Sequence, residues 1–245
     1  MILTKDIELI DGLPIAYIKS LDAFAIADMH LGYEGVMAKT SGTAIPKVNL
    51  KYIKDAILEA LKKHKAKQLI IDGDIKNEFS KVDEEEFNEL YDFINFAKTS
   101  GLSLTLIKGN HDNFVDKYKE PFKLTIYTQE AKLGNYLFFH GEELPKNIEK
   151  TKMLIMGHEH PGIGIKTMAG SIERVKCFLF GKYFNIPILV LPAISYFASS
   201  SDINMKPKNE LLAPVFKNIN VDSMHAIAVG YGATIDFGKI KDLKM

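Results

Sequence analysis

Side chains that can bind metal ions gather in five short segments of this 245-residue sequence. Five of its seven histidines lie there, together with aspartates and an asparagine. In chain order the segments are Asp28-Met29-His30, Asp72-Gly73-Asp74, Gly109-Asn110-His111-Asp112, His140-Gly141 and Gly157-His158-Glu159-His160. A single such residue would indicate little, but five segments of one chemical kind predict a shared site.

The residue types indicate which ions that site would hold. Carboxylate and amide oxygens with imidazole nitrogens, and no thiolate, suit manganese, iron, cobalt, nickel or zinc better than calcium or a structural zinc. Seven candidate ligands are too many for one tetrahedral ion, and they suit two ions roughly 3.5–4 Å apart that share a carboxylate. We therefore predict a dinuclear site.

Each segment follows a run of apolar residues that is typical of a buried strand. The runs are 23–27, 68–71, 102–107, 136–139 and 153–156. Ligands collect at the carboxyl ends of strands in α/β sheets, because the loops there project side chains into one crevice. Two ligand pairs have members two residues apart: Asp28 with His30, and His158 with His160. Along an extended segment that spacing turns both side chains the same way, so each pair can serve one site.

The first half of the chain alternates such strands with helical patterns, which favours an α/β architecture. Asn49 is placed to cap a helix that ends near His64. Asp83 and Glu86 have the spacing of a capping box, and they predict a second helix that stops at Gly101.

The second half is rich in strand patterns. Leu133-Gly134-Asn135 predicts a hairpin turn, and further strand-like runs occupy 173–184, 186–191, 225–230 and 233–238. We expect two packed sheets with helices outside them. Turn residues are spread along 1–245 and no change of composition marks a linker, so we predict a single domain.

The ordered set D-x-H, G-D, G-N-H-D, an isolated H and G-H-x-H resembles the motif set of the calcineurin-like metallophosphoesterases. The match runs from Asp28 to His160. The resemblance divides the ligands between two ions. One ion would be held by Asp28, His30 and His160. The other would be held by Asn110, His140 and His158, and Asp74 would bridge the two.

Two more residues receive roles from the resemblance. His111 would contact the scissile phosphate and protonate the leaving oxygen, and Asp112 would orient the His111 ring. The implied fold is a four-layer αββα sandwich of two packed mixed β-sheets flanked by helices. The implied cofactors are two divalent ions, for which we expect Mn²⁺, with Fe²⁺, Ni²⁺, Co²⁺ or Zn²⁺ as the alternatives.

One segment departs from the family pattern. Many members continue the second motif as G-D-x-x-D, whereas this chain reads Gly73-Asp74-Ile75-Lys76-Asn77-Glu78. Asn77 therefore replaces a carboxylate near the predicted site. The segments DMHLGYE and GDIKNEF resemble most closely a branch of small archaeal and bacterial phosphoesterases related to the repair nuclease SbcD.

Composition excludes several classes of protein. With 47% hydrophobic and 25% charged residues the chain is neither disordered nor collagen-like. Cys177 is the only cysteine, which excludes an internal disulfide, and its place in an alternating run predicts a buried, inert thiol. The N-terminal segment lacks the pattern of a signal peptide, and the longest apolar run, 186–198, is too short to span a bilayer. We expect a cytoplasmic protein without a membrane partner.

The charge balance bears on partners. Lysine and arginine number 31 against 31 acidic residues, which argues against general binding of polyanions. Arg174 is the only arginine, so phosphate recognition has to depend on metal ions or backbone amides. Lys62, Lys63, Lys65 and Lys67 form a cluster that we interpret as a solvated helix end, with contact to a phosphate backbone as the alternative.

Other conspicuous residues are expected to be structural or supporting. His64 and His225 belong to none of the motifs, Glu159 should point away from the ligands on either side of it, and Asp72 and Glu78 flank the predicted bridging residue. Aromatic residues in loops that could border the crevice are Tyr33, Phe79, Phe114, Tyr196 and Phe197. Nucleobases stack on such rings, but packing is the simpler expectation.

These observations predict an enzyme. We expect a dinuclear metal-dependent phosphoesterase that hydrolyses a phosphodiester by attack of metal-activated hydroxide, with a nucleotide or nucleic acid as the candidate substrate. Two alternatives stay open, a phosphomonoesterase and a non-catalytic binding scaffold of the same fold. The presence of His111 beside the ligands argues against the scaffold. The oligomeric state is left open, a homodimer included.

Overall fold

Two β-sheets form the centre of the protein, for which a computed structural model describes residues 1–42, 45–78, 84–230 and 232–244. The first sheet contains, in spatial order, β1 (Ile7–Leu9), β2 (Ala16–Ile18), β3 (Ala23–Ile26), β4 (Gln68–Asp72), β5 (Ser103–Ile107) and β6 (Thr125–Tyr127). Strands β3 to β6 run parallel, whereas β1 and β2 add to them antiparallel. The first sheet is therefore mixed.

The second sheet is larger and also mixed. Its main path is β13 (Ser201–Asp202), β10 (Pro161–Lys166), β11 (Ile172–Tyr183), β12 (Ile186–Val190), β9 (Met153–Met156), β8 (Tyr136–Phe139) and β7 (Glu130–Leu133). Off this path, β14 (His225–Gly230) pairs with β11, and β15 (Ala233–Lys239) pairs with β14. The parallel pairs β8 with β9 and β9 with β12 bring three carboxyl ends to one edge.

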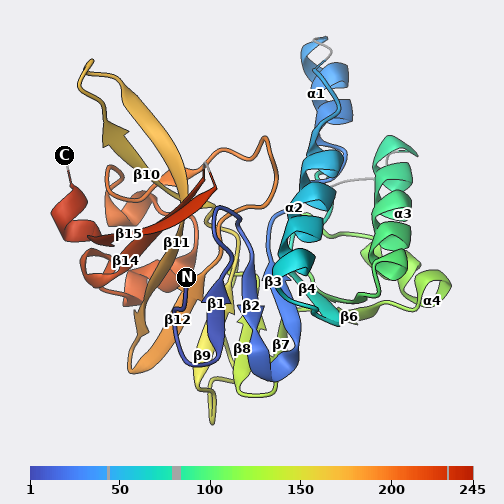
Figure 1. The fold of residues 1–245 in the computed structure, drawn as a ribbon, viewed down its shortest axis with the longest axis horizontal. Helices are drawn as coiled ribbons and strands as arrows, with labels where there is room; N and C mark the ends of the chain where they lie inside the picture. The colour runs from blue at the N-terminus through green and yellow to red at the C-terminus, as the bar shows by residue number, and fades with distance from the viewer. Residues whose placement is uncertain (43–44, 79–83, 231, 245) are drawn as a thin grey trace.

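Helices cover the outer faces of the sheets. The α-helices of the described residues are α1 (Tyr33–Ser41), α2 (Asn49–Lys63), α3 (Glu84–Thr99) and α4 (Lys119–Phe122). Short 3₁₀ helices are η1 (Lys19–Leu21), η2 (Val115–Tyr118), η3 (Lys208–Glu210), η4 (Pro214–Asn218), η5 (Val221–Ser223) and η6 (Ile240–Leu243). In Figure 1, α1 to α3 lie to one side of the strands, and β10, β11, β14 and β15 lie on the other.

Three apolar clusters fill the spaces between these layers. On the outer face of the first sheet, Phe24 and Leu69 pack against Ile53 of α2 and Phe93 of α3. Between the sheets lies a second cluster, which includes Ile70, Phe138, Phe178 and Leu189. Beyond the second sheet a third cluster includes Leu154, Met156, Val215 and Phe216. The layers are thus helix, sheet, sheet and an outer layer in which 3₁₀ helices and loops stand in for long α-helices.

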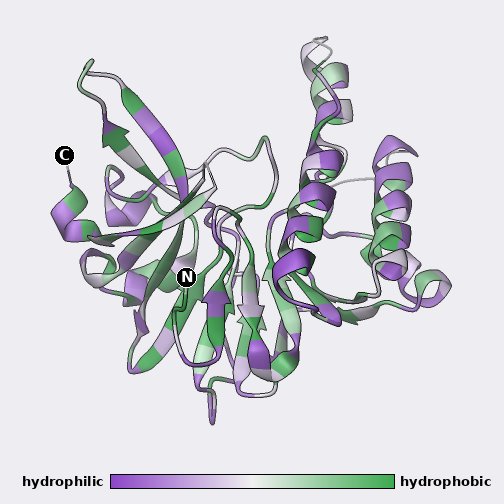
Figure 2. Cartoon of the chain, viewed as in Figure 1, coloured by the Kyte–Doolittle hydropathy of each residue, from purple (hydrophilic) through white to green (hydrophobic). Residues whose placement is uncertain are grey.

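The two long helices follow from their apolar periodicity. In α2 the buried face includes Ile53, Ile57 and Ala60, and in α3 it includes Leu90 and Ile94. Figure 2 shows hydrophilic stretches along both helices and many hydrophobic residues in the strands of the two sheets. Both helices were predicted close to their observed bounds, and the four-layer fold class is confirmed.

The predicted cap of α2 is wrong. Val48 is the N-cap and makes no side-chain cap bond, while Glu34 Oε1 accepts hydrogen bonds from the backbone amides of Val48 and Asn49 at 3.0 and 2.8 Å. A carboxylate from α1 therefore does what the Asn49 side chain was expected to do. Asp83 of the predicted capping box lies outside the described residues. In the ranges that are described, no helix has the length and apolar character needed to cross a membrane.

Candidate metal centre

The five polar segments meet where strands of both sheets end. In the first sheet, the amides of Asp28 and His30 donate to the carbonyls of Gly73 and Asp74 at 3.1 and 2.9 Å, so the loops after β3 and β4 run side by side. The segment after β12 joins the same loops, because the amide of Ile194 donates to Ala27 O at 2.9 Å. The segments thus meet at the carboxyl ends of strands from both sheets, as predicted for α/β sheets.

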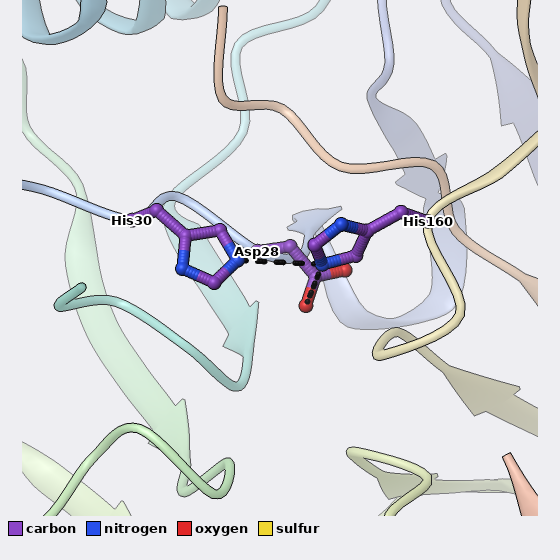
Figure 3. A group of neighbouring side chains, drawn as sticks. All are labelled: Asp28, His30 and His160. Atoms are coloured by element: carbon purple, nitrogen blue, oxygen red, sulfur yellow. Dashed lines mark hydrogen bonds and ion pairs between the residues drawn. The ribbon is translucent and has the colours of Figure 1, made fainter. Parts of the chain in front are cut away.

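One group of ligand atoms comes from Asp28, His30 and His160, all within 4.8 Å of one another (Figure 3). His160 Nε2 lies 3.3 Å from Asp28 Oδ1 and 3.3 Å from His30 Nε2. Two ring nitrogens at that distance repel unless a proton or a cation lies between them. The group therefore suits a shared cation.

A second group contains Asp74, His140 and His158, again within 4.8 Å of one another. His140 Nε2 lies 3.3 Å from Asp74 Oδ2, and His140 Nδ1 donates to the carbonyl of Asp72 at 2.8 Å. That bond fixes the tautomer and turns Nε2 toward the centre, as is usual for histidines that bind metal. Asp74 also belongs to a group with His30 and His111. It therefore lies where a residue shared by two ions has to lie.

Asn110 tests whether metal ions fit this centre. Its amide oxygen is buried and, within the part of the chain that the structure describes, has no hydrogen-bond partner. The next residue, His111, donates its backbone amide to Asp74 Oδ1 at 2.9 Å, which places Asn110 beside the shared carboxylate. A buried oxygen without a partner is costly unless a cation or water binds it. The donor set of carboxylate, amide and imidazole therefore fits divalent ions.

Five of the seven predicted ligands have a left-handed backbone. Of the ten non-glycine residues with positive φ in the described ranges, five are predicted ligands: Asp28 (57°), His30 (47°), Asp74 (51°), His158 (67°) and His160 (49°). The ligand pairs follow strands, as predicted, but their members are not extended. The expected reason for their common direction was wrong, because tight left-handed turns and not pleated strands aim these side chains.

Two glycines allow the loops to approach one another. A Cβ on Gly73 would lie 2.0 Å from His140 Nδ1, and a Cβ on Gly109 would lie 2.3 Å from Asp74 Oδ1. Neither distance is compatible with a side chain. The glycines of the G-D and G-N-H-D segments are therefore required by the close packing of the centre.

Burial and charge set the protonation of the ligands. Burial lowers the pKa of His30 and of His158 to about 4, so both imidazoles are neutral near pH 7 and have a free lone pair. Burial alone would raise the pKa of Asp74, but the neighbouring His140 outweighs it and the pKa is lowered. Burial alone would lower the pKa of the His140 and His160 rings. Asp74 beside His140 and Asp28 beside His160 outweigh burial, so the pKa of each ring is raised.

His111 lies at the rim of the two groups. Its Nδ1 donates to the carbonyl of Asn77 at 2.6 Å, and its Nε2 lies 3.8 Å from Asp74 Oδ2. Its ring meets that of His30 edge to face at 5.0 Å. Because a carbonyl can only accept, Nδ1 carries a hydrogen, and Nε2 is the ring nitrogen that faces Asp74.

Asp112 has contacts that differ from the expected one with the His111 ring. Its carboxylate accepts hydrogen bonds from the backbone amides of Gly109, Ile75 and Lys76 at 2.9, 3.0 and 3.4 Å. Burial and the charge of Asp74 raise its pKa to about 7. The expected role is corrected: Asp112 ties two ligand loops together, and the Asn77 carbonyl orients His111.

Three supporting residues were missed in the sequence. Asn49 Nδ2 donates to the carbonyl of Met29 at 2.9 Å and to that of His30 at 3.3 Å, while its Oδ1 accepts from Tyr196 N at 2.8 Å. Lys176 Nζ donates to the carbonyls of Ala193, at 2.9 Å, and Ser195. These side chains hold loops by their backbones, and nothing in residue spacing marks such a role.

The third missed residue, Glu86 of α3, holds the segment that bears Asn77. Its Oε1 accepts hydrogen bonds from the amides of Asn77 and Glu78 at 2.9 and 2.8 Å, and its Oε2 lies 3.4 Å from Lys76 Nζ. The side chains of Lys76 and Glu86 are only 1% and 2% exposed. This buried pair fixes the carbonyl that orients His111.

Other candidates lie away from the ligand groups. His64 stacks on Tyr17 at 4.3 Å, and His225 Nδ1 lies 3.0 Å from Asp236. Glu159 is fully buried and accepts a bond from Ala213 N at 2.9 Å, so it anchors a loop instead of pointing into solvent. The lysine cluster 62–67 precedes the first residue of β4, whereas the ligands follow the last one. It therefore lies at the opposite end of the sheet from the centre.

A family model for calcineurin-like phosphoesterases matches residues 23–159. The chain belongs to the calcineurin-like phosphoesterase family. Members of this family depend on a centre of two metal ions, and the three groups of histidine and aspartate side chains agree with that property. Family membership and the ligand groups together support a metal-binding hydrolase of phosphoesters. Among curated proteins, no sequence matches the chain.

Solved structures include proteins that are similar to this calcineurin-like phosphoesterase. Nuclease MPE from Pseudomonas putida is similar with a TM-score of 0.63 at 18% identity, over 91% of this chain and 93% of that one. The E. coli phosphoesterase YfcE has a TM-score of 0.41 at 16% identity, over 87% and 96% of the two chains. At these identities the likeness to MPE shows the fold alone, and the likeness to YfcE carries no argument.

Proposed function

We propose that the protein is a phosphodiesterase that requires two divalent ions, with nucleotide or nucleic acid diesters as its substrates. The placement of His111 carries this proposal. Its Nε2 lies beside Asp74, which is shared by two ligand groups, and its Nδ1 is held by Asn77 O. A proton donor is therefore fixed next to the point where a phosphate would meet both ligand groups.

The charges around the centre favour a diester over a monoester. Among the described residues, Lys76 and Lys176 donate hydrogen bonds to loops of the centre. Lys76 is buried and Lys176 is half-buried, and both are engaged with protein groups. Neither is free to neutralise the second negative charge that a phosphomonoester carries. The similar structure of MPE is described as that of a nuclease, which accords with a diester substrate.

The chain's own residues divide the work of hydrolysis. Bound divalent ions would polarise the phosphoryl oxygens, lower the pKa of a water molecule and offset developing negative charge. Asp28, His30 and His160 would hold one ion, Asn110, His140 and His158 the other, and Asp74 would contact both. The imidazolium form of His111 would give its Nε2 proton to the leaving oxygen and become the neutral ring that keeps its hydrogen on Nδ1, which contributes about 10²- to 10⁴-fold in rate.

The test compares an aryl phosphodiester with an aryl phosphomonoester after the protein has been stripped of metal and reloaded with Mn²⁺. We expect faster hydrolysis of the diester. His111→Ala should keep its metal and lose about 10²- to 10⁴-fold in kcat, whereas Asp74→Asn should lose metal by elemental analysis. His64→Ala, which removes a histidine outside the centre, is the matched control.

Each claim is contradicted by a different result. Reloaded protein that hydrolyses neither ester contradicts catalysis, and faster hydrolysis of the monoester makes the protein a phosphatase. Full metal content in Asp74→Asn contradicts the shared role of that carboxylate.

A further inference from the structure

Three aromatic side chains lie together beside the centre, and we call them the aromatic shelf: Tyr33, Tyr196 and Phe197. The rings of Tyr33 and Phe197 stack with centroids 5.3 Å apart and planes 12° from parallel. Tyr196 meets Phe197 nearly edge on, at 5.1 Å and 83°. Tyr52 of α2 supports the shelf from behind, with its ring 5.4 Å from that of Tyr196.

The shelf is built on the same loops as the ligands. Tyr33 follows His30 by three residues, and its amide donates to His30 O at 3.3 Å. Tyr196 and Phe197 follow Ser195, whose amide donates to Asp28 O at 3.2 Å. Two residues after Phe197, the carbonyl of Ser199 lies 3.4 Å from the ring of His160. The shelf therefore adjoins the group formed by Asp28, His30 and His160.

A buried side chain holds the backbone of the shelf in place, although one of its rings reaches solvent. Asn49, which is fully buried, accepts a hydrogen bond from Tyr196 N and at the same time donates to the carbonyl of His30. The Tyr196 side chain is nevertheless 56% exposed. Packing into the core explains Tyr33 and Phe197 only in part and does not explain Tyr196. A fixed, exposed ring beside a phosphoester centre suits a flat ligand group.

We propose that the aromatic shelf stacks a nucleobase of the substrate next to the scissile phosphate, so that the substrate is a single-stranded nucleic acid or a nucleotide diester. Unpaired bases present the faces that such rings bind, whereas a duplex hides them. Stacking also needs no positive charge, which suits a chain with zero net charge. This inference rests on the proposed phosphodiesterase function and names the class of substrate for it.

The absence of tryptophan from the sequence provides a direct probe. Phe197→Trp would introduce one indole on the shelf of the full chain. Phe184→Trp is the matched control, because Phe184 is 66% exposed and lies in the turn between β11 and β12, at the opposite end of β12 from the centre. Indole emission is followed in Mn²⁺ while a short phosphorothioate deoxyadenylate strand, or an abasic strand of equal length, is added.

We expect saturable quenching of the Phe197→Trp emission by the deoxyadenylate strand, much weaker quenching by the abasic strand, and no saturable change in the Phe184→Trp control. Equal quenching by both strands, or none by either, overturns the inference. The readout does not require turnover. Base-dependent quenching in a protein that hydrolyses no ester would remove the phosphodiesterase function and leave the shelf as a binding site.

A second measurement keeps the test valid if Phe197→Trp does not fold. Tyr196→Leu should raise the KM for a deoxyadenylate strand about tenfold, the order expected for one lost stacking contact, with little change in kcat. Tyr196→Phe should retain the native KM, and neither variant should change the KM for the abasic strand. An unchanged KM in Tyr196→Leu overturns the inference even where the diester is hydrolysed.

Discussion

The pKa values of the histidines of the centre are shifted in opposite directions, although the rings lie in neighbouring ligand groups. Burial lowers the pKa of His30 and His158 to about 4, whereas Asp74 and Asp28 raise the pKa of His140 and His160 above the usual value. The first two rings are ready to bind metal at neutral pH. The other two hold protons in the metal-free protein to a higher pH and have to release them when an ion binds.

Metal binding should therefore release protons and strengthen as the pH rises. Between pH 6 and 8 we expect the affinity for Mn²⁺ to increase, because protons on His140 and His160 compete with the ion below their raised pKa values. Calorimetric titration in buffers of different ionisation enthalpy measures the proton release. His64→Ala should leave it unchanged, and a pH-independent affinity would contradict the proton competition.

At the scale of residues, the sequence indicated the candidate ligands but not the groups that orient their rings. The ligand candidates carry their own chemistry, so residue type, spacing and the resemblance to a known family could nominate them, and the structure brings their aspartates and histidines together. The groups that orient the rings of His111 and His140 are the backbone carbonyls of Asn77 and Asp72. Every residue has a carbonyl, so no residue type reports which one will be used.

At the scale of elements, α3 reaches the centre through one buried ion pair. Glu86 holds the amides of Asn77 and Glu78 and lies opposite Lys76. Removing the charge of one partner leaves the other uncompensated in a buried place. The helix thereby contributes both to stability and to the setting of His111.

Glu86→Gln should destabilise the protein by about 3–5 kcal/mol, because Lys76 would remain buried without a counter-charge. The double variant Lys76→Met/Glu86→Gln keeps an amide oxygen for Asn77 and Glu78 and removes the lone charge, so much of the loss should be recovered. Urea denaturation followed by circular dichroism measures both. A single variant as stable as the native protein would show that the pair is not coupled.

Strand β11 carries a cysteine that should be inert. Cys177 is fully buried, and burial raises the pKa of its thiol, so the reactive thiolate is not formed. We expect no reaction with an aromatic disulfide reagent between pH 7 and 9 in the folded protein, and full reaction in guanidinium. Ser41→Cys at the exposed end of α1 should react in both states. Reaction of the folded native protein would contradict the burial.

The elements that the sequence missed have physical reasons. Helix α1 buries only Glu34 and Gly35, so it has no apolar stripe to recognise. Strand β10 contains Gly162 and Gly164, which weaken a strand pattern. The 3₁₀ helices beyond the second sheet are too short to show any period. By contrast β3, β4, β5 and the long helices have strong patterns, and they were predicted within a few residues.

At the scale of the whole molecule, the centre connects the two sheets. Asp28, Asp74 and Asn110 follow strands of the first sheet, and His140, His158 and His160 follow strands of the second. Ions held by both sets would bind the folded chain and not the unfolded one. Such binding stabilises by mass action, by about 2.7 kcal/mol at a hundredfold excess over the Kd.

Mn²⁺ should therefore raise the Tm of the metal-free protein, and the rise should grow with the Mn²⁺ concentration. Asp74→Asn, which lacks the shared carboxylate, should show a smaller rise, while His225→Ala, at the first residue of β14 and outside the ligand groups, should match the native response. Differential scanning calorimetry with EDTA as the reference makes the comparison. Equal Tm values with and without Mn²⁺ would contradict a centre that joins the sheets.

The left-handed backbone at five ligand positions places ligands for activity but lowers the stability of the protein. For most residues a left-handed conformation costs about 1 kcal/mol relative to an ordinary one; the cost is smaller for aspartate and absent for glycine. In metal-free protein His160→Gly should therefore be more stable than His160→Ala. Selection of variants for heat resistance alone would favour loss of the ligands, so a thermostable form of this protein has to be selected for turnover at the same time.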